Sequence, residues 1–213
     1  MLSVGLTGGV ASGKSEVAAL LLAHGAAVRD ADAVVADLYE PGREGARAVA
    51  TLFGSRVLDG EGRVDRVVLR ELVLADAGGR SALEAIVHPL VRAEVGRWLA
   101  TLEGRGGGPA VAVIEAALLV ETGAFRAYHR LVVVSSPLET RRQRALAAGW
   151  SADRFQRTAA AQASETEREA VADYVVRNQG SRAALAGEVD TLWSLLLADE
   201  AALRRGEPLP ARR

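Results

Sequence analysis

The pattern of apolar and polar positions along the chain predicts strands that alternate with helices. Five short runs are rich in Val, Ile, Leu and Ala, and several are apolar at consecutive positions rather than at every second one. This pattern is typical of parallel strands that helices cover on both faces. The predicted strands are residues 3–7, 26–29, 110–116, 130–135 and 174–177. The sequence therefore predicts an α/β fold with a five-stranded parallel sheet.

The segments between these strands have helical character. Ser15–His24 is a predicted helix directly after the first strand. The gap between the second and third strands, about 80 residues, is too long for a simple crossover, and its apolar positions recur with helical spacing in Val67–Leu74 and Leu83–Leu102. We therefore expect a helical insertion there that binds substrate.

These boundaries give a predicted division of one folded unit. The core comprises about residues 1–40, 110–136 and 173–198, the first insertion about 41–109, and a second, Arg- and Glu-rich helical insertion about 137–172. Two segments are expected to be flexible or disordered. They are the glycine-rich exit 104–109 and the tail 201–213.

Composition narrows the possible functions. The chain has 213 residues, 49% of them hydrophobic, and a net charge of −1, so no overall basic field exists to gather nucleic acid. The absence of Cys excludes disulfides and Cys-based zinc sites. No signal-type segment and no uncharged apolar run of membrane-spanning length is found. We expect a soluble, cytoplasmic protein without a membrane partner, and its oligomeric state stays open.

The strongest motif is GGVASGKS at Gly8–Ser15, which fits the phosphate-binding pattern G-x-x-x-x-G-K-[ST]. Lys14 is the only lysine among 26 basic residues, so an amine stands here in a chain that otherwise uses arginine. In such a loop, backbone N–H groups wrap the phosphates, the lysine reaches the outer phosphates and Ser15 ligates Mg²⁺. A strand before the loop and a helix after it disfavour the alternative, a glycine-rich turn with an incidental lysine. The predicted nucleotide-binding residues are Gly9, Val10, Ala11, Ser12, Gly13, Lys14, Ser15 and Glu16.

Two aspartates, Asp30 and Asp32, follow the second strand. The carboxyl ends of parallel strands border the ligand crevice, where an aspartate can accept a proton from an attacking hydroxyl or hold Mg²⁺ through water. The alternative is a helix N-cap, because aspartate is favoured at that position. We favour a functional role for Asp32 and a structural or supporting role for Asp30.

Glu115 and His88 each allow two interpretations. Glu115 interrupts an apolar strand, where a carboxylate is costly unless it lies near a cation. It is expected either near Mg²⁺ or at an edge or strand end that faces solvent. His88 precedes Pro89, a pair that we expect to open a helix. Its imidazole either points at substrate or is an ordinary part of the first helical turn.

The second insertion carries several arginines. On a mobile flap they would suit charge stabilisation of a transferring phosphoryl group. The alternative is a solvated helix face on which glutamates pair with them. The arginines are Arg141, Arg142, Arg144, Arg154 and Arg157, and the glutamates are Glu139, Glu165, Glu167 and Glu169.

Taken together, these segments resemble the dephospho-coenzyme A kinase family. VGLTGGVASGKSEVA resembles the family's P-loop, and HGAAVRDADAVVADLYEPG resembles its second strand with the D-A-D segment. FGSRVLDGEGRVDRVVLRELV and LEAIVHPLVRAE are similar to its coenzyme-binding helical domain, with the D-G…D-R and H-P elements. ALLVETG and AAQASETEREAVADYVVRNQG resemble its L-L-x-E segment and the approach to its last strand. The resemblance spans about Leu2 to Val189.

The resemblance implies a P-loop kinase fold with a helical substrate-binding insertion and a helical lid. It implies ATP- and Mg²⁺-dependent phosphorylation of the ribose 3′-hydroxyl of dephospho-coenzyme A, the final step of coenzyme A synthesis. The implied catalytic residues are Asp32 as the base, Lys14 and Arg144. Asn178 would lie with Arg144 near ATP and its adenine, Ser15 would ligate the metal, and Glu115 would take the place of an acid often found in that strand. The implied residues on the dephospho-coenzyme A side are His88, Arg92 and Glu121, together with Asp32.

Three positions depart from the family pattern. Ala117 stands where the family usually has Pro, and Glu16 replaces the common Thr after G-K-S. An arginine expected about four residues after Arg144 is missing, since residues 147–149 are Ala, Ala and Gly. We expect Arg154 or Arg157 to complete the lid instead.

Two other functions compete with this one. A different nucleoside or nucleotide kinase could use the same fold, although the D-G…D-R and H-P elements favour dephospho-coenzyme A. A P-loop switch protein generally needs an N-K-x-D element to read the base. That element is impossible here, because the only lysine lies in the P-loop.

Overall fold

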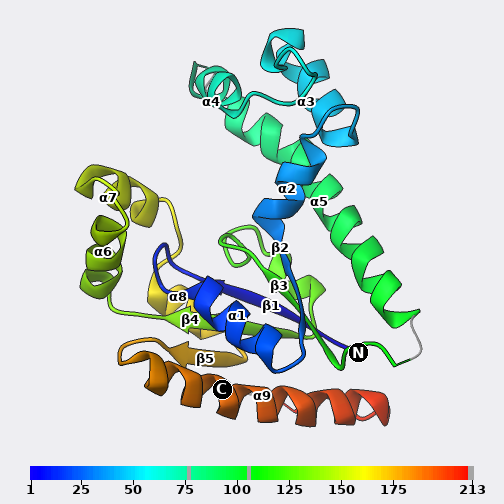
Figure 1. Ribbon diagram of the computed structural model, residues 1–213, viewed down its shortest axis with the longest axis vertical. Coiled ribbons are helices and arrows are strands. Elements are labelled where there is room, and N and C mark those ends of the chain that lie inside the picture. The colour runs from blue at the N-terminus through cyan, green and yellow to red at the C-terminus, as the bar shows by residue number, and fades with distance from the viewer. Residues whose placement is uncertain (76–77, 105–106, 211–213) are drawn as a thin grey trace. The chain divides into compact units, whose positions relative to one another are not determined.

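The computed structural model describes residues 1–75, 78–104 and 107–210, and its sheet has the strand order β2-β3-β1-β4-β5 (Figure 1). β1 pairs in parallel with β3 and β4, and β4 pairs in parallel with β5. The strands are β1 (Leu2–Gly8), β2 (Ala27–Asp30), β3 (Val111–Glu115), β4 (Arg130–Ser135) and β5 (Tyr174–Arg177). The predicted α/β fold is confirmed, with each strand close to its predicted position.

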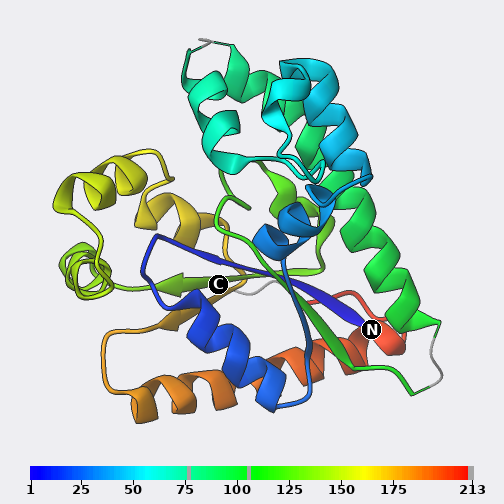
Figure 2. The ribbon, with the colours of Figure 1, turned by 45° about the horizontal axis from the view of Figure 1, so that its top comes forward.

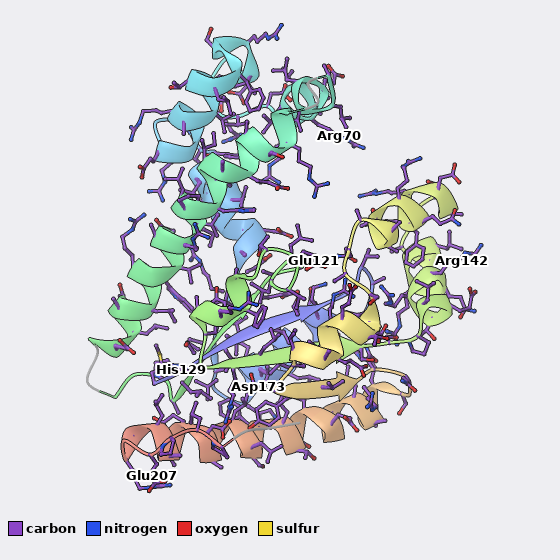
Figure 3. The ribbon with its side chains drawn as sticks, turned by 180° about the vertical axis from the view of Figure 1, so that it is seen from behind. Arg70, Glu121, His129, Arg142, Asp173 and Glu207 are labelled. Carbon is purple, nitrogen blue, oxygen red and sulfur yellow. The ribbon has the colours of Figure 1, made fainter. Side chains whose placement is uncertain are left out.

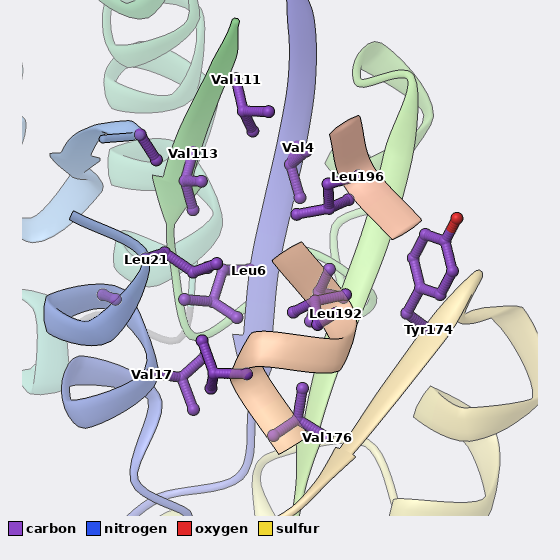
Figure 4. Packing of buried hydrophobic residues seen from close by; sticks show 14 of the residues in the cluster. Val4, Leu6, Val17, Leu21, Val111, Val113, Tyr174, Val176, Leu192 and Leu196 are labelled. Carbon is purple, nitrogen blue, oxygen red and sulfur yellow. The ribbon is translucent and has the colours of Figure 1, made fainter. Parts of the chain in front are cut away.

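One face of the sheet packs against two helices, α1 (Lys14–Ala23) and α9 (Arg182–Arg204). Figures 1 and 2 show these helices side by side beneath the sheet. Alternate residues of β1 face them, and Leu6 packs there with Val17 and Leu192 in the main core (Figure 4). β1 is buried at all seven positions, which explains its continuous apolar character in the sequence.

The opposite face is covered by the segment after β3 and by α8 (Glu165–Val171). Leu131 and Val133 of β4 pack there with Leu119. Gly5 permits this close approach, because a β-carbon added to it would lie 2.9 Å from Leu119 Cδ1 and 2.9 Å from Tyr128 Cδ2. Both faces of β1 are therefore covered, as a parallel sheet requires.

Three helices lie between β4 and β5: α6 (Leu138–Ala147), α7 (Ala152–Ala160) and α8. Ser151 caps α7 by accepting a hydrogen bond from the Arg154 N–H at 3.2 Å. Ser164 and Glu167 form a capping box at α8, in which Glu167 Oε2 accepts from the Ser164 backbone N–H at 2.7 Å. These local signals set where each helix begins.

The chain divides into two compact units, residues 1–29 with 102–213 and residues 30–101. The second unit contains α2 (Ala31–Leu38), α3 (Glu44–Phe53), α4 (Arg66–Ala75) and α5 (Gly79–Glu103) around its own buried side chains. The predicted insertion at about 41–109 therefore begins too late. The reason is that Asp30 ends β2 and is also the N-cap of α2, so the chain enters the helical unit directly from the sheet.

The D-G…D-R element of this unit forms a turn and a helix cap. Asp59 Oδ1 accepts hydrogen bonds from the backbone N–H groups of Glu61 and Arg63, and the turn is closed by a bridge between Leu58 and Val64. Asp65 then accepts from the N–H of Val67 at 2.8 Å, at the start of α4. Both aspartates are therefore used by the backbone in this structure.

His88 and Pro89 do not open a helix, which corrects the sequence prediction. α5 begins at Gly79 and runs through Pro89 to Glu103. Proline removes one backbone hydrogen bond from a helix interior. The helix continues because its apolar positions keep one side packed, with Val87 and Val95 buried before and after the proline.

The predicted disordered tail is wrong for residues 201–204, which belong to α9. The chain beyond the helix is also fixed at one point, since Arg130 Nη2 donates to the Pro210 carbonyl at 2.7 Å. Arg130 is buried and pairs with Asp199 at 2.6 Å and Asp173 at 2.9 Å. Residues 211–213 of the predicted tail and 105–106 of the predicted exit lie outside the described residues. Within the part that the structure describes, no helix is both long enough and apolar enough to cross a membrane.

Candidate functional site: the P-loop and the arginines beside it

The P-loop connects the end of β1 to the first residue of α1, as the motif predicts. The Lys14 ammonium donates to the carbonyl of Gly8 at 3.0 Å and to that of Gly9 at 3.4 Å. The backbone N–H of Val10 donates to Gln162 Oε1 at 2.8 Å. The charged end of Lys14 therefore lies at the start of the loop, among Gly8–Val10, which we call the Gly9 end.

The middle of the loop is tightly turned. Ala11 has φ 58°, a left-handed backbone conformation that is costly for a residue with a β-carbon. Ser12 is fully buried, and its backbone N–H donates to the Gly9 carbonyl at 3.1 Å. Its hydroxyl oxygen has no hydrogen-bond partner among the described residues. The loop thus keeps a buried polar group that its own fold does not satisfy.

Ser15 meets Glu115 at the carboxyl end of β3. The Ser15 hydroxyl donates to Glu115 Oε1 at 2.8 Å, and Glu115 pairs in register with Leu6 of β1. β3 is an inner strand of the sheet, so Glu115 is not on an edge strand, but it is the last residue of β3 and is partly exposed, as the strand-end alternative predicts. The carboxylate therefore stands beside the hydroxyl that the motif assigns to Mg²⁺. Glu16, the next residue, forms an ion pair with Arg182 at 2.6 Å.

The other end of the loop, Ser12–Gly13, is the Gly13 end, and Arg144 and Asn178 hold it. Asn178 Nδ2 donates to the Ser12 carbonyl at 2.8 Å. Arg144 donates to the Ser12 carbonyl and the Ser136 hydroxyl through Nη1, and to the carbonyl and Oδ1 of Asn178 through Nη2, over 3.1–3.3 Å. Gly13 has φ 95°, and a β-carbon there would lie 2.2 Å from Asn178 Nδ2. The structure thus brings together Lys14, Arg144 and Asn178 around one loop.

Two further arginines contact the Gly9 end. A β-carbon added to Gly9 would lie 2.0 Å from Arg141 Nη1 and 3.4 Å from Arg168 Nη1. The two side chains are 6% and 2% exposed. Burial lowers the pKa of Arg141, Glu165 opposes this shift, and nearby Arg168 adds to it. Two buried guanidinium groups therefore meet at the loop.

Each of these arginines has one carboxylate partner. Arg141 Nη2 lies 3.8 Å from Glu165 Oε2, and Arg168 Nη2 donates to Glu121 Oε1 at 3.2 Å. Glu121, labelled in Figure 3, also accepts a hydrogen bond from the Ala163 N–H at 2.8 Å. Glu121 thus holds the segment that leads into α8, a role that the sequence did not predict.

Arg154 and Arg157, one of which we expected to complete the lid, are both exposed. The Arg154 guanidinium lies over the Trp150 ring, 3.7 Å from its centroid. Arg168 and Gln162 were not predicted from the sequence as contacts of the loop. The only signal was their place in a segment similar to the family, because a lone arginine among glutamates reads as a solvated helix face.

The remaining predicted residues belong to the unit formed by residues 30–101. Asp30 is the N-cap of α2, and its Oδ1 accepts from the Asp32 backbone N–H at 2.8 Å, which confirms its structural role. The Asp32 side chain is exposed. His88 is half-buried and Arg92 is exposed, one turn apart on α5.

A parallel sheet with a glycine-rich loop after its central strand, a lysine at the start of the next helix and a hydroxyl beside it defines a P-loop nucleotide-binding protein. The model of the dephospho-CoA kinase family matches residues 2–184. The chain therefore belongs to the dephospho-CoA kinase family.

Individual relatives agree with this assignment. The chain is 41% identical over 198 residues to a dephospho-CoA kinase from Frankia casuarinae, covering 93% of this chain and 85% of that protein. It is 43% identical over 202 residues to one from Methylococcus capsulatus, covering 93% and 100%. A crystal structure of a Thermus thermophilus protein, TT1252, superposes with a TM-score of 0.77 at 34% identity and covers 91% of this chain and 96% of that one.

Proposed function

We propose that this chain transfers the γ-phosphoryl group of ATP to the ribose 3′-hydroxyl of dephospho-coenzyme A, releasing coenzyme A and ADP. The observation that carries the proposal is membership of the dephospho-CoA kinase family across residues 2–184, in a chain whose P-loop is complete. In the reaction, the bond from the γ-phosphorus to the β-phosphate oxygen breaks as a bond to the ribose oxygen forms. The product would complete coenzyme A synthesis.

The nucleotide would bind with its phosphates in the P-loop. Lys14 supplies a compact charge for the outer phosphates, and the loop N–H groups supply the cradle. Arg144 and Asn178 support this role from the Gly13 end, where they fix the Ser12 carbonyl. They would also border the nucleotide, in keeping with the family resemblance.

A magnesium ion fits the residues at Ser15 and Glu115. Their side-chain oxygens lie 2.8 Å apart, and Mg²⁺ in kinases is usually held by one or two protein oxygens together with substrate phosphates. When bound, the ion would neutralise negative charge that develops on the phosphates during transfer. Ser15 would ligate it, and Glu115 would hold it directly or through water.

Asp32 is our proposed general base, which takes the proton of the ribose hydroxyl as its oxygen attacks. The support in this chain is local. Asp30 fixes the Asp32 backbone N–H at the start of α2, so the base stands in an ordered first helical turn. Most of the rate enhancement would come from positioning and charge neutralisation rather than from this proton transfer.

His88, Arg92 and Glu121 are proposed for the dephospho-coenzyme A side, on the strength of the family resemblance. His88 and Arg92 share one side of α5, since they are four residues apart. Glu121 Oε1 is already engaged by Arg168 and the Ala163 N–H, so any substrate contact would use its other oxygen. A cytoplasmic location remains part of the proposal, and it rests on the sequence alone.

A coupled ADP-release assay with several acceptors tests the proposal. Dephospho-coenzyme A should be preferred over AMP, CMP and shikimate by roughly 100-fold or more in kcat/KM, since a site built for one acceptor leaves polar groups unpaired with the others. Asp32→Asn should lower kcat by roughly 100-fold and leave ADP affinity unchanged. Asp30→Asn is the matched control and should be milder. Equal use of another acceptor, or equal effects of the two variants, would overturn the assignment.

A further inference from the structure

Arg141 of α6 and Arg168 of α8 come from different helices and converge on one residue, Gly9. A β-carbon at Gly9 would lie within 3.4 Å of a terminal nitrogen of each, and 2.0 Å from that of Arg141. Both side chains are more than nine-tenths buried. The two side chains can approach the loop this closely only because residue 9 is a glycine. The loop and the two arginines therefore form one packed cluster.

The two guanidinium groups keep unused hydrogen-bond donors. Arg141 is oriented by its Nε, which donates to the Ser136 carbonyl at 3.1 Å. Its Nη1 and Nη2 form no hydrogen bond with the described residues, and the ion pair from Nη2 to Glu165 Oε2 is 3.8 Å long. Arg168 donates through Nη2 to Glu121, whereas its buried Nε has no partner in the described part of the chain.

An anion at the Gly9 end would offset the charge of both arginines and accept from the terminal nitrogens that face the loop. Two like charges buried side by side are costly, and burial already lowers the pKa of Arg141, with Arg168 adding to the shift. Unused N–H groups of a buried guanidinium carry a further desolvation cost. Guanidinium groups bind phosphate oxygens through two parallel hydrogen bonds, so a phosphoryl group matches what is unsatisfied here.

The position of the two arginines along the loop indicates which phosphate of the nucleotide they would bind. The Lys14 ammonium contacts the Gly8 and Gly9 carbonyls, and the P-loop lysine is the group that reaches the outer phosphates of a nucleotide. The two arginines therefore lie at the outer-phosphate end. Arg144 lies at the other end, where both of its terminal nitrogens already donate to protein acceptors, in four hydrogen bonds to Ser12, Ser136 and Asn178.

We propose that Arg141 and Arg168 bind the γ-phosphoryl group of the nucleotide and stabilise its charge during transfer. They thereby take the role expected of an arginine after Arg144, where this chain has Ala147, Ala148 and Gly149. The inference rests on the proposed kinase function. In the transfer, the ribose proton passes to the base, and ADP carries away the bridging oxygen.

Kinetics of Arg141→Gln and Arg168→Gln test this pair. Each should lower kcat by about 100-fold or more, because a charge that acts on the transferring group is lost. ADP affinity should stay within about threefold of the wild type, since ADP lacks the γ-phosphate. Arg141→Lys should recover only part of kcat, because lysine keeps the charge but not the fork. The matched control is Arg142→Gln, an exposed arginine on the outer side of α6 (Figure 3), which should change nothing. A kcat within threefold of the wild type for both Arg141→Gln and Arg168→Gln would overturn the proposal.

A measurement on the wild-type protein covers the case in which a buried arginine cannot be replaced without unfolding. The N–H NMR signals of Arg141 and Arg168 should shift when a non-hydrolysable ATP analogue is added and stay in place with ADP. Equal shifts with both nucleotides, or none with either, would contradict the proposal. This binding result does not depend on the acceptor. If wild-type turnover of dephospho-coenzyme A is absent but the signals shift, the proposed function fails and the arginine pair stands.

Discussion

The two ends of the P-loop lie beside two arginines, Arg144 and Arg141, which are one turn apart on α6 but differ in their hydrogen bonding. Arg144 gives four hydrogen bonds to protein acceptors at the Gly13 end. Arg141 is more deeply buried, yet its side-chain hydrogen bond within the described residues runs from Nε to the Ser136 carbonyl, while its Nη1 faces Gly9. Burial alone therefore does not separate a structural arginine from one that binds ligand.

The two arginines differ instead in how many of their N–H donors the protein already occupies. A guanidinium whose terminal nitrogens both donate to protein acceptors stabilises the fold, and removing it takes a charged donor from each of those acceptors. A buried guanidinium with unused donors lowers the stability of the fold without ligand. A bound anion would offset this cost. We therefore infer that the arginine at the Gly13 end fixes the conformation of the loop, whereas the arginines at the Gly9 end bind the charge of a ligand.

The largest expected effect is at Lys14, which belongs to the charged end. Lys14→Arg should lower kcat by roughly 100-fold or more, because the wide, planar guanidinium does not fit where the ammonium contacts the Gly8 and Gly9 carbonyls. Thermal unfolding should be nearly unchanged. ADP release with ATP and dephospho-coenzyme A measures the first quantity. Retention of more than about a tenth of the wild-type rate would show that the site does not demand an amine.

Arg144→Ala tests the shape-holding end. It should lower the free energy of unfolding by about 2–3 kcal/mol, since the Ser12 and Asn178 carbonyls lose a charged donor in a buried setting. ATP and ADP affinities should fall together, because the whole loop loosens. Urea unfolding and calorimetric titration measure both quantities. A selective loss of ATP affinity with unchanged stability would indicate that Arg144 binds the γ-phosphate. It would contradict the distinction drawn between Arg144 and Arg141.

Adding one methyl group at each end compares them directly. At Gly9 the new β-carbon meets the far end of a flexible side chain, Arg141, so Gly9→Ala should lower kcat about tenfold with little change in unfolding. At Gly13 it meets Asn178 and also requires φ 95°, so Gly13→Ala should cost about 1–3 kcal/mol of stability. Measurements of kcat and of urea unfolding on both variants test these two expectations. The reverse ranking of stabilities would contradict the assignment of the two ends.

The smallest effect is expected between the ends, at Ala11. Its φ of 58° is unfavourable for a residue with a β-carbon, and glycine adopts it without that cost. Ala11→Gly should therefore raise the free energy of unfolding by up to about 1 kcal/mol, although the more flexible unfolded chain offsets part of the gain. Urea unfolding provides the measurement, and a loss of stability would show that Ala11 is not strained.

The sequence was sufficient for the sheet and the loop because both depend on local patterns. β1, β3 and β4 are continuous apolar runs, and the P-loop is contiguous in sequence. Contacts between distant segments could not be predicted in this way. Arg168 and Gly9 are far apart along the chain, and no periodicity reveals that they meet. The prediction that Pro89 opens a helix was wrong because packing along α5 overrides this local signal for a helix start.

The isolation of Lys14 has a practical consequence for chemical labelling. Apart from the amino terminus, its ammonium is the one amine in the chain, and it lies half-buried against the loop carbonyls. A reagent that acylates amines therefore has one side-chain target, inside the P-loop. Mass spectrometry of the labelled peptide would follow loop occupancy without mutation or a reporter group, with the amino terminus as the internal reference.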